Sequence, residues 1–531
     1  MYISKLSLRN YRNFKNACLT FNKEVNTIIG ENGTGKTNVM QAMRILLDES
    51  LPRTYRLHES DFNRSIGNWK GHWIIIQLFF DELDHGDEAQ ALTLHSIGEA
   101  SEPDTSKGSC SVIFRPKFPI RKELYELSIS EEKTDDALTE ILNKITIDNY
   151  EILYTSKGYV DFSENTLYKK YVGDFDKIIF PDPTDFAYDV YGTKLYIGNL
   201  TKEVSCTYVK ALRDVEADLK SYRDNPLINL LRGKEKTIEI GKKNDIVERI
   251  QTLNNEISNL DEVKEISQGI ANSVRTSIGE TYAPGISIKS ELPEDMEKLM
   301  QALKLWVGDN IDEPYQGRIW ELSLGGANLI YLSTKLLEYE KVKSQDKIAN
   351  FLLIEEPEAH IHTHIQKTLF QKIPGLNTQV IITTHSTHIS SVCKISAMNV
   401  LSKSKNLVHV FNPAKNLNTD EITRIERYLD AVRSNLLFAK GVILVEGDAE
   451  QILIPALVKA VLCVSLDEIG VSLVNIGSTG FQNLARIFHQ DRIGKYCSII
   501  TDLDKSIVEL PNDSDDDTKE ELAYRNSELK G

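Results

Sequence analysis

The sequence predicts an α/β protein in which a first α/β region, interrupted by a helical insertion, is followed by a second, Rossmann-like α/β region. Three observations support this fold class. A glycine-rich loop at residues 30–37 joins an apolar run to a helix-like segment. Residues 205–300 become helical and charged, with few strand signals. From residue 441 onward, short apolar runs alternate with helical segments in the order β-α-β-α-β.

Composition sets outer limits. At 531 residues the chain is too long for one hydrophobic core, and its length indicates about three or four domains. It is 41% hydrophobic and 26% charged, as in ordinary soluble proteins, with no signal-peptide core and no apolar run near the ~18 residues of a membrane span. The six cysteines form no CxxC pair, so we expect a reducing cytoplasm and no disulfide framework. A net charge of −16 means that any DNA contact must use local patches or metal ions among acidic groups.

Short apolar runs lead up to and follow the glycine-rich loop, and they have the alternation typical of strands. These runs are residues 2–14, 18–21, 25–29, 73–80, 110–114 and 124–130. We therefore expect an antiparallel sheet beside the loop. Arg9, Arg12 and Asn13 are either nucleotide contacts or solvated residues at a strand end.

The glycine-rich loop has the features of a phosphate-binding loop. Its candidate binding residues are Gly30, Asn32, Gly33, Gly35, Lys36 and Thr37. Glycines let the backbone curl so that N–H groups converge on phosphate oxygens without intervening side chains. Lys36 is then placed to reach the β- and γ-phosphates, and Thr37 opens the helix with a hydroxyl for Mg²⁺. Residue types, spacing and strand-to-helix context all agree, so we prefer this to a glycine turn that binds nothing.

The helical insertion carries an apolar stripe about three heptads long. The stripe consists of Ile246, Ile250, Leu253, Ile257, Leu260, Val263 and Ile266. Such a stripe needs a partner. It indicates either a helical hairpin or dimerisation arm inserted into the first region, or an amphipathic helix packed on its own globular lobe.

The segments after the insertion supply further groups for a nucleotide site. Ser323, Gly325 and Gly326 precede a helical stretch, and a helix N-terminus suits a γ-phosphate. The apolar strand 351–354 ends in Glu355 and Glu356, which places one carboxylate beside Mg²⁺ and another where it can polarise a water. The strand 380–384 delivers His385 in the same way. These strand ends together indicate a nucleotide hydrolase.

The order of these motifs resembles the ABC-type ATPases of the recombination-mediator, SMC and OLD group. In that group two ATPase heads sandwich ATP, and the signature loop of one head completes the site of the other. The resemblance implies that Lys36 and Thr37 bind phosphate and Mg²⁺, that Glu355 supports Mg²⁺, that Glu356 is the general base and that His385 senses the γ-phosphate. Asn328 stands where the signature usually has Gln. The implied domains are an ATPase head over 1–204 and 301–430 and a helical dimerisation arm over 205–300.

His360, His362 and His364 offer a competing explanation for the segment after the paired acids. On a helix, His360 and His364 would share one face, which makes them candidate zinc ligands. No HExxH pattern or other ligand cluster accompanies them, so we prefer a loop and helix at the interface between heads.

The C-terminal region places acidic residues after two of its strands. Glu446 and Glu450 follow the apolar run 441–445, and Asp502 and Asp504 follow the run 496–501. In an open α/β sheet such ends face one crevice, so these carboxylates can surround one or two divalent ions. Solvated acids at strand ends are the alternative.

This pattern of Val-Glu-Gly-x-x-Glu, then Gly, then Asp-x-Asp resembles the TOPRIM domain, here over 431–531. An ABC-type ATPase followed by a TOPRIM domain resembles the OLD family, which includes the nuclease subunit of Gabija antiviral systems and effectors linked to some retrons. The resemblance implies ATP and Mg²⁺ (or Mn²⁺) as cofactors, with two-metal hydrolysis of phosphodiesters.

The resemblance also implies a function and partners. We expect an ATP-hydrolysing, metal-dependent DNA endonuclease of antiviral defence, a homodimer or higher homo-oligomer that acts with a helicase, or with a reverse transcriptase and its RNA/DNA product. The alternative is a DNA-binding ATPase clamp with inert TOPRIM acids. OLD-type TOPRIM domains usually continue well beyond the equivalent of Asp504, so we expect this chain to be a shortened version that lacks part of the nuclease site.

Overall fold

The computed structural model divides the chain into two compact units. Unit 1 comprises residues 1–438 and 487–494, and unit 2 comprises residues 439–486 and 495–531. The structure describes residues 1–48, 51, 55–83, 107–131, 133–156, 158, 160–184, 191–211, 218, 225–235, 238–278, 289–290, 292–293, 295–301, 303, 305–307, 317–318, 321, 323–342, 347–363, 366–367, 370, 378–404, 407–429, 433–477 and 480–501.

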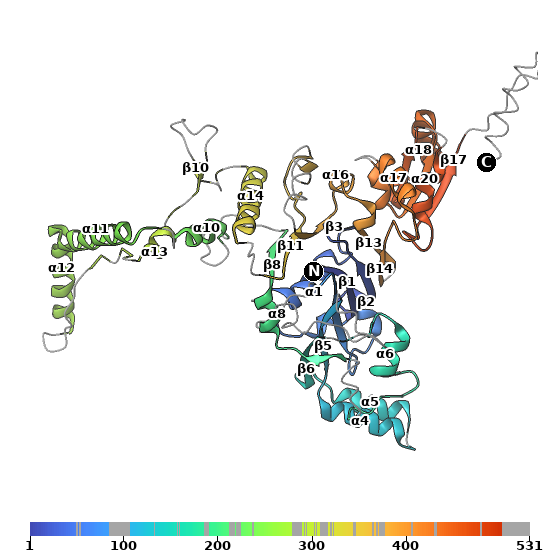
Figure 1. Ribbon diagram of the computed structural model, residues 1–531, viewed down its shortest axis with the longest axis horizontal. Coiled ribbons are helices and arrows are strands. Elements are labelled where there is room, and N and C mark those ends of the chain that lie inside the picture. The colour runs from blue at the N-terminus through green and yellow to red at the C-terminus, as the bar shows by residue number, and fades with distance from the viewer. Residues whose placement is uncertain are drawn as a thin grey trace, which may run out of the picture. The chain divides into compact units, whose positions relative to one another are not determined.

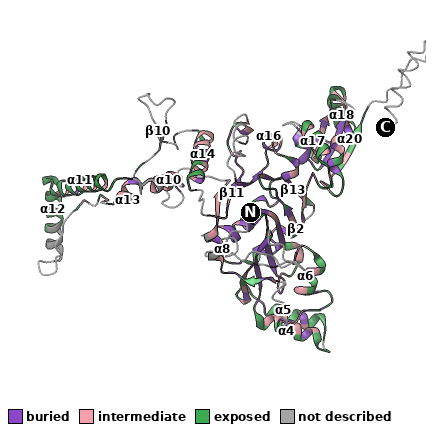
Figure 2. Ribbon diagram, in the orientation of Figure 1, coloured by how far each residue is buried: buried purple, intermediate pink, exposed green. Residues whose placement is uncertain are grey.

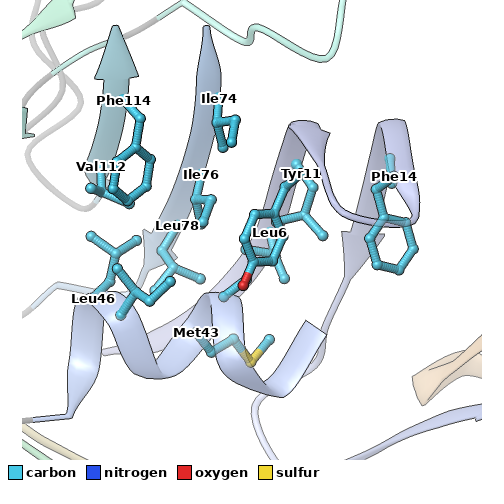
Figure 3. Close-up of a cluster of buried hydrophobic side chains, with 14 of the residues drawn as sticks. Leu6, Tyr11, Phe14, Met43, Leu46, Ile74, Ile76, Leu78, Val112 and Phe114 are labelled. Atoms are coloured by element: carbon cyan, nitrogen blue, oxygen red, sulfur yellow. The ribbon is translucent and has the colours of Figure 1, made fainter. Parts of the chain in front are cut away.

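An antiparallel sheet forms the first layer of unit 1, as the alternating apolar runs predicted (Figure 1). Its strands, in spatial order, are β2 (Phe14–Thr20), β1 (Tyr2–Tyr11), β4 (Ile74–Asp81), β5 (Gly108–Pro116), β6 (Tyr150–Ser156) and β7 (Thr193–Lys194). Helix α1 (Lys36–Leu47) packs on this sheet, and its Met43 and Leu46 point toward Leu78 and neighbouring strand residues (Figure 3). Burying each such side chain contributes about 1.5–3 kcal/mol, which holds in place the helix that begins at Lys36.

A second, mostly parallel sheet carries the nucleotide motifs. Its strands, in order, are β14 (Leu407–Phe411), β13 (Met398–Ser404), β3 (Val25–Gly30), β12 (Gln379–Thr384), β11 (Ala349–Glu355) and β8 (Val204–Val209), and only β14 is antiparallel to its neighbour. Because β3, β12 and β11 are adjacent and parallel, their carboxyl ends meet at one edge. The side chain of Gln379 ties the two sheets together, since it hydrogen-bonds both the N–H and the carbonyl of Ile3 at 2.8 and 2.7 Å.

Strand β8 was not expected, because the chain from residue 205 onward had been assigned to the helical insertion. Its sequence is short and mixed, with Ser205, Cys206 and Thr207 at its centre. It pairs in parallel with β11, in a register that sets Tyr208 opposite Leu353. A strand whose pairing partner lies so far along the chain carries too weak a local signal to be identified without the sheet.

The prediction of a strand at residues 124–130 was wrong, because this segment lies in helix α4 (Phe118–Ile129). Pro119 stands in the first turn of α4, a position that suits proline since its missing N–H would have no partner there. Leu124 and Leu127, three residues apart, are its buried residues, which is the spacing of a helix face rather than of a strand.

The described residues of the helical insertion form four helices: α10 (Pro226–Glu235), α11 (Ile240–Asn259), α12 (Asp261–Ile278) and α13 (Met296–Gln301). The apolar stripe is not continuous, because Leu260 between α11 and α12 has extended backbone with ψ 139°. Part of the stripe is exposed, for example Leu253 at 44% and Ile266 at 57%, while Ile250, Ile257 and Val263 are half-buried. Figure 2 shows exposed and intermediate residues along α11 and α12. Asn254 is the buried residue of α11, and it hydrogen-bonds the backbone of Leu292.

The other elements of unit 1 are short, apart from one long helix, α14. The helices are α5 (Asp135–Asn143), α6 (Asn165–Tyr171), α8 (Ile197–Glu203), α14 (Leu324–Val342), α16 (Thr387–Ser390) and α17 (Thr419–Tyr428), and the strands are β9 (Trp306–Val307) and β10 (Gly317–Arg318). Short 3₁₀ helices lie at Glu59–Asp61, Arg64–Ile66, Ile147–Asn149, Ile395–Ala397, Arg433–Leu437 and Arg486–Phe488. In the last of these, Arg486 belongs to unit 2 and the two following residues belong to unit 1. Within the described ranges, no helix combines the length and apolar character that crossing a membrane requires.

Unit 2 is built on a three-stranded parallel sheet in the order β16 (Val471–Asn475), β15 (Gly441–Val445), β17 (Tyr496–Ile500). Its helices are α18 (Asp448–Leu462), α19 (Leu466–Ile469) and α20 (Phe481–Ala485). In register, Val445 lies beside both Asn475 and Ile500, so the carboxyl ends of all three strands lie at one edge. This is the β-α-β-α-β arrangement that the sequence predicted.

Candidate nucleotide and metal sites

The phosphate-binding loop curls tightly between β3 and α1. Gly33 and Gly35 have φ of 78° and 98°, values that side chains rarely tolerate. A Cβ on Gly30 would lie 2.8 Å from the carbonyl oxygen of Leu401, so the neighbouring strand also requires glycine there. The Lys36 ammonium donates to the carbonyls of Gly30 and Glu31 at 2.9 and 3.2 Å, which places it at the centre of the loop.

Asn13 supports the loop from outside. Its side-chain amide donates to the carbonyl of Gly33 at 3.2 Å, and its oxygen accepts from Asn38 at 2.6 Å. Arg12 in turn donates to Asn38 at 2.9 Å and to Asp61 at 2.9 Å. The sequence left these residues as nucleotide contacts or solvated ends, whereas the structure uses both to brace the loop and the first turns of α1.

Glu356 lies between the two basic groups of the site. Its Oε1 is 3.9 Å from Lys36 Nζ and 3.5 Å from His385 Nδ1. The hydrogen bond with His385 lowers the pKa of Glu356, and the same contact raises the pKa of His385. Burial lowers the pKa of Lys36, an effect that Glu356 opposes. The structure therefore brings together three of the predicted residues, with the Glu356 carboxylate near both the Lys36 ammonium and the His385 ring.

Glu358 is a residue that the sequence reasoning missed. It is buried, and its Oε1 accepts from Thr384 Oγ1 at 2.7 Å and from the backbone N–H of His385 at 2.9 Å. It also lies 3.4 Å from His385 Nδ1. Glu358 thus holds the turn that carries His385. In the sequence, the signal for this role is the position of Glu358 two residues after Glu356.

Glu355 ends β11 and is 3% exposed. Its Oε2 accepts a hydrogen bond from the Tyr208 hydroxyl at 2.5 Å, while its Oε1 has no hydrogen-bond partner among the described residues. A buried carboxylate oxygen without a donor is costly unless a cation or water completes it. Thr37, an exposed residue at the start of α1, would add a hydroxyl. Carboxylate and hydroxyl oxygens are ligands that Mg²⁺ accepts, so the chemistry of these residues fits this ion.

The signature residues lie at the start of a helix rather than in a loop before one. Helix α14 begins at Leu324, earlier than expected, so Gly325 and Gly326 are in its first turn. The Ser323 hydroxyl accepts from the Gly326 N–H at 3.3 Å as an N-cap. A Cβ on Gly325 would lie 2.3 Å from the carbonyl oxygen of His360. The signature therefore packs in its own subunit against the turn after Glu356.

Asn328 and His360 are two further residues near the signature. Asn328, where Gln was expected, is buried and donates weakly to the carbonyl of Ala359 at 3.4 Å. His360 has φ of 61° and lies in a turn rather than on a helix, and His364 is outside the described residues. The i, i+4 argument for zinc therefore fails.

The acids of unit 2 are only partly described. The carboxylate of Glu446, directly after β15, accepts from Thr501 Oγ1 at 2.6 Å, which joins the ends of β15 and β17. Glu450 accepts from the Gly447 N–H at 3.0 Å and so caps α18. Asp502 and Asp504 lie outside the described residues. Within the described part of the chain, no group of three or more His, Cys, Asp or Glu residues is arranged to hold a metal ion.

Two family models match the chain, and their order agrees with the geometry above. The model described as AAA ATPase domain matches residues 1–390. The model described as Overcoming lysogenization defect protein-like, TOPRIM domain matches residues 437–504. The chain therefore belongs to the OLD nuclease family of enzymes, with an AAA ATPase domain followed by an OLD-like TOPRIM domain. This confirms the family and the α/β fold class that the motifs predicted, and these domain types use ATP and divalent metal ions.

Individual proteins are also similar to this chain, each over a different share of its length. Endonuclease GajA of Bacillus cereus (strain VD045) is 23% identical over 500 residues, which is 91% of this chain and 72% of GajA. The DNA replication and repair protein RecF of Bacillus cytotoxicus is 48% identical over 54 residues, which is 10% of this chain and 14% of RecF. Among solved structures, an SMC head bound to the C-winged helix domain of ScpA has 15% identity and a TM-score of 0.36 over 77% of this chain and 97% of that chain.

Proposed function

We propose that this protein is an ATP-hydrolysing, metal-dependent DNA endonuclease of OLD type that nicks DNA or cleaves both strands in antiviral defence in the cytoplasm. The nuclease half rests on the hydrogen bond from Thr501 to Glu446 at 2.6 Å. This contact brings the residue directly before Asp502 to the first acid of the TOPRIM pattern. The similarity to endonuclease GajA supports the same activity.

In the ATPase half, each residue has a role that its surroundings allow. Lys36, at the centre of the loop, would bind the β- and γ-phosphates. Glu356 is ionised at neutral pH because of its lowered pKa, so it can accept a proton from the attacking water as general base. His385, whose ring is 44% exposed, would contact the γ-phosphate. Thr37 and Glu355 would hold Mg²⁺.

In the nuclease half, Glu446, Glu450, Asp502 and Asp504 would hold one or two Mg²⁺ or Mn²⁺ ions. Such ions, when bound, activate water and stabilise the leaving oxygen of a phosphodiester. The carboxylates keep their negative charges close together only if cations offset their repulsion. This requirement makes cleavage depend on divalent ions.

We also propose that the protein forms a homodimer or higher homo-oligomer. The apolar stripe on α11 and α12 is exposed, which suits an arm that pairs with a second copy. The signature helix α14 packs against the turn at His360 and presents an exposed Ser323, so it is available to complete the ATP site of another copy. A helicase, or a reverse transcriptase with its RNA/DNA product, is the partner we expect in a defence system, and the gene neighbourhood would identify which.

The test of this function is plasmid nicking with Mg²⁺ or Mn²⁺ by the full-length gene product. We expect Asp502→Ala and Asp504→Ala to abolish cleavage and leave ATP hydrolysis intact, because the two acids belong to the TOPRIM site alone. Asp467→Ala, which removes an exposed acid of the same unit, is the matched control and should cut like the wild type.

Two results would argue against the nuclease. Cleavage that persists in EDTA or in the Asp502→Ala/Asp504→Ala variant would reject the two-metal site. Wild-type protein that hydrolyses ATP and binds DNA, yet never cleaves it with either metal, would favour the ATPase clamp.

A further inference from the structure

Tyr208 is the one described side chain that hydrogen-bonds Glu355. The two residues are 147 positions apart, and they meet because β8 and β11 are adjacent parallel strands. The contact leaves one oxygen of Glu355 fixed at 2.5 Å from a hydroxyl and the other, Oε1, buried without a hydrogen-bond partner among the described residues. A carboxylate restrained at one oxygen presents the other in a single direction.

Tyr208 is itself held by the helix that begins the phosphate-binding loop. The guanidinium of Arg44, on α1, lies 4.0 Å from the centre of the Tyr208 ring. Arg44 is oriented by two hydrogen bonds to Asp48 Oδ2, at 3.1 and 2.9 Å.

The three elements α1, β8 and β11 therefore converge on one carboxylate. The helix α1 supplies Thr37 at its start and Arg44 two turns later, while β11 supplies Glu355. Groups that hydrogen-bond a metal-binding carboxylate from behind orient it, and their loss typically weakens metal binding by about 10–100-fold. A Glu side chain has one more rotatable bond than an Asp side chain, so a Glu at this position needs such a restraint more than an Asp would.

We propose that Tyr208 is a positioning residue for the divalent cation of the ATP site. Tyr208 acts by fixing Glu355 Oε2, so that Oε1 faces the cation or its water shell. This inference rests on the proposed ATP site and extends it to a residue outside every nucleotide motif. Tyr208 touches neither nucleotide nor metal in this role, so its effect must pass through Glu355.

The test compares nucleotide affinity with and without metal in Tyr208→Phe, which removes the hydroxyl and keeps the ring on Arg44. A fluorescent, non-hydrolysable ATP analogue is titrated in Mg²⁺ and in EDTA. We expect the gain in affinity that Mg²⁺ provides to fall about 10-fold or more, with affinity in EDTA unchanged. Turnover by Tyr208→Phe should recover at high Mg²⁺, which a general loss of structure would not allow. Tyr339→Phe is the control, since its hydroxyl bonds Thr378 at 2.6 Å elsewhere in unit 1.

A double-mutant cycle with Glu355→Gln makes the test independent of folding effects. If Tyr208 acts through Glu355, adding Tyr208→Phe to Glu355→Gln changes the Mg²⁺ effect no further. The inference is overturned if Mg²⁺ raises nucleotide affinity equally in the wild type and in Tyr208→Phe. It is also overturned if Tyr208→Phe reduces this gain by the same factor in the wild-type and Glu355→Gln proteins. If the wild type binds no nucleotide, the proposed ATP site is rejected instead, so the two failures are distinguishable.

Discussion

At the scale of single residues, the proposed ATP site places Glu356 close to both Lys36 and His385. Glu356 Oε1 lies 3.9 Å from Lys36 Nζ and 3.5 Å from His385 Nδ1, distances long enough for a phosphate or water to alter each contact. Glu358 anchors the His385 turn from behind through the backbone N–H at 2.9 Å. Removing Lys36 and removing Glu356 should therefore affect different steps.

We predict that Lys36→Ala loses ATP binding, whereas Glu356→Gln binds ATP but does not hydrolyse it. The ammonium of Lys36 is the cation within the loop, while the loss of a general base typically costs about 10²–10⁴-fold in rate. Nucleotide binding and steady-state turnover, measured on both variants, check this. Normal turnover by Glu356→Gln would show that another group takes the proton.

At the scale of elements, the break at Leu260 divides the expected long helix into α11 and α12. Apolar side chains of the stripe are nevertheless exposed on both helices, with Ile246 on α11 at 37% and Ile266 on α12 at 57% exposure. Exposed apolar rows of this kind mark interaction surfaces. The exposure favours the dimerisation arm over a helix buried on its own lobe.

We predict that Leu253→Asp combined with Ile266→Asp shifts the protein from oligomer to monomer, because two charges in an apolar contact lack partners. Light scattering after size-exclusion chromatography measures the mass. Asn255→Asp adds a charge at an exposed polar position of the same helix and should leave the mass unchanged. An oligomer that survives the double substitution would place the contact elsewhere.

At the scale of the whole molecule, the chain joins two proposed sites of different chemistry, and a short stretch of sequence separates His385 from the start of unit 2 at Ala439. A head that closes on ATP has two states, and such an element can bias a second site. Whether ATP promotes or restrains cleavage depends on which state the nuclease prefers.

We predict that nucleotide state changes nicking by roughly 5- to 150-fold, the range that corresponds to a typical coupling of 1–3 kcal/mol. Nicking is measured for the wild type without nucleotide, with ATP and with a non-hydrolysable analogue, and for Lys36→Ala with ATP. Equal rates in all four conditions would show that the two sites act independently.

Several features could be read from sequence because their signals are local. The glycines of the phosphate-binding loop, the apolar strands that end in Glu355 and His385, and the acids after residue 445 each sit within a few residues of the element that positions them. Spacing of glycine, apolar and acidic residues reports backbone geometry directly. The family and its two domains followed from the order of these motifs.

Other features were decided only when distant segments paired. Strand β8 joins the sheet through β11, and that pairing alone sets Tyr208 against Glu355 across 147 positions. The role of Glu358, the bracing by Asn13 and the break at Leu260 likewise depend on neighbours that no local pattern names. Hydrogen bonds and burial are properties of the packed chain, so a side chain's partner is determined by the order of strands in the sheet rather than by its place in the sequence.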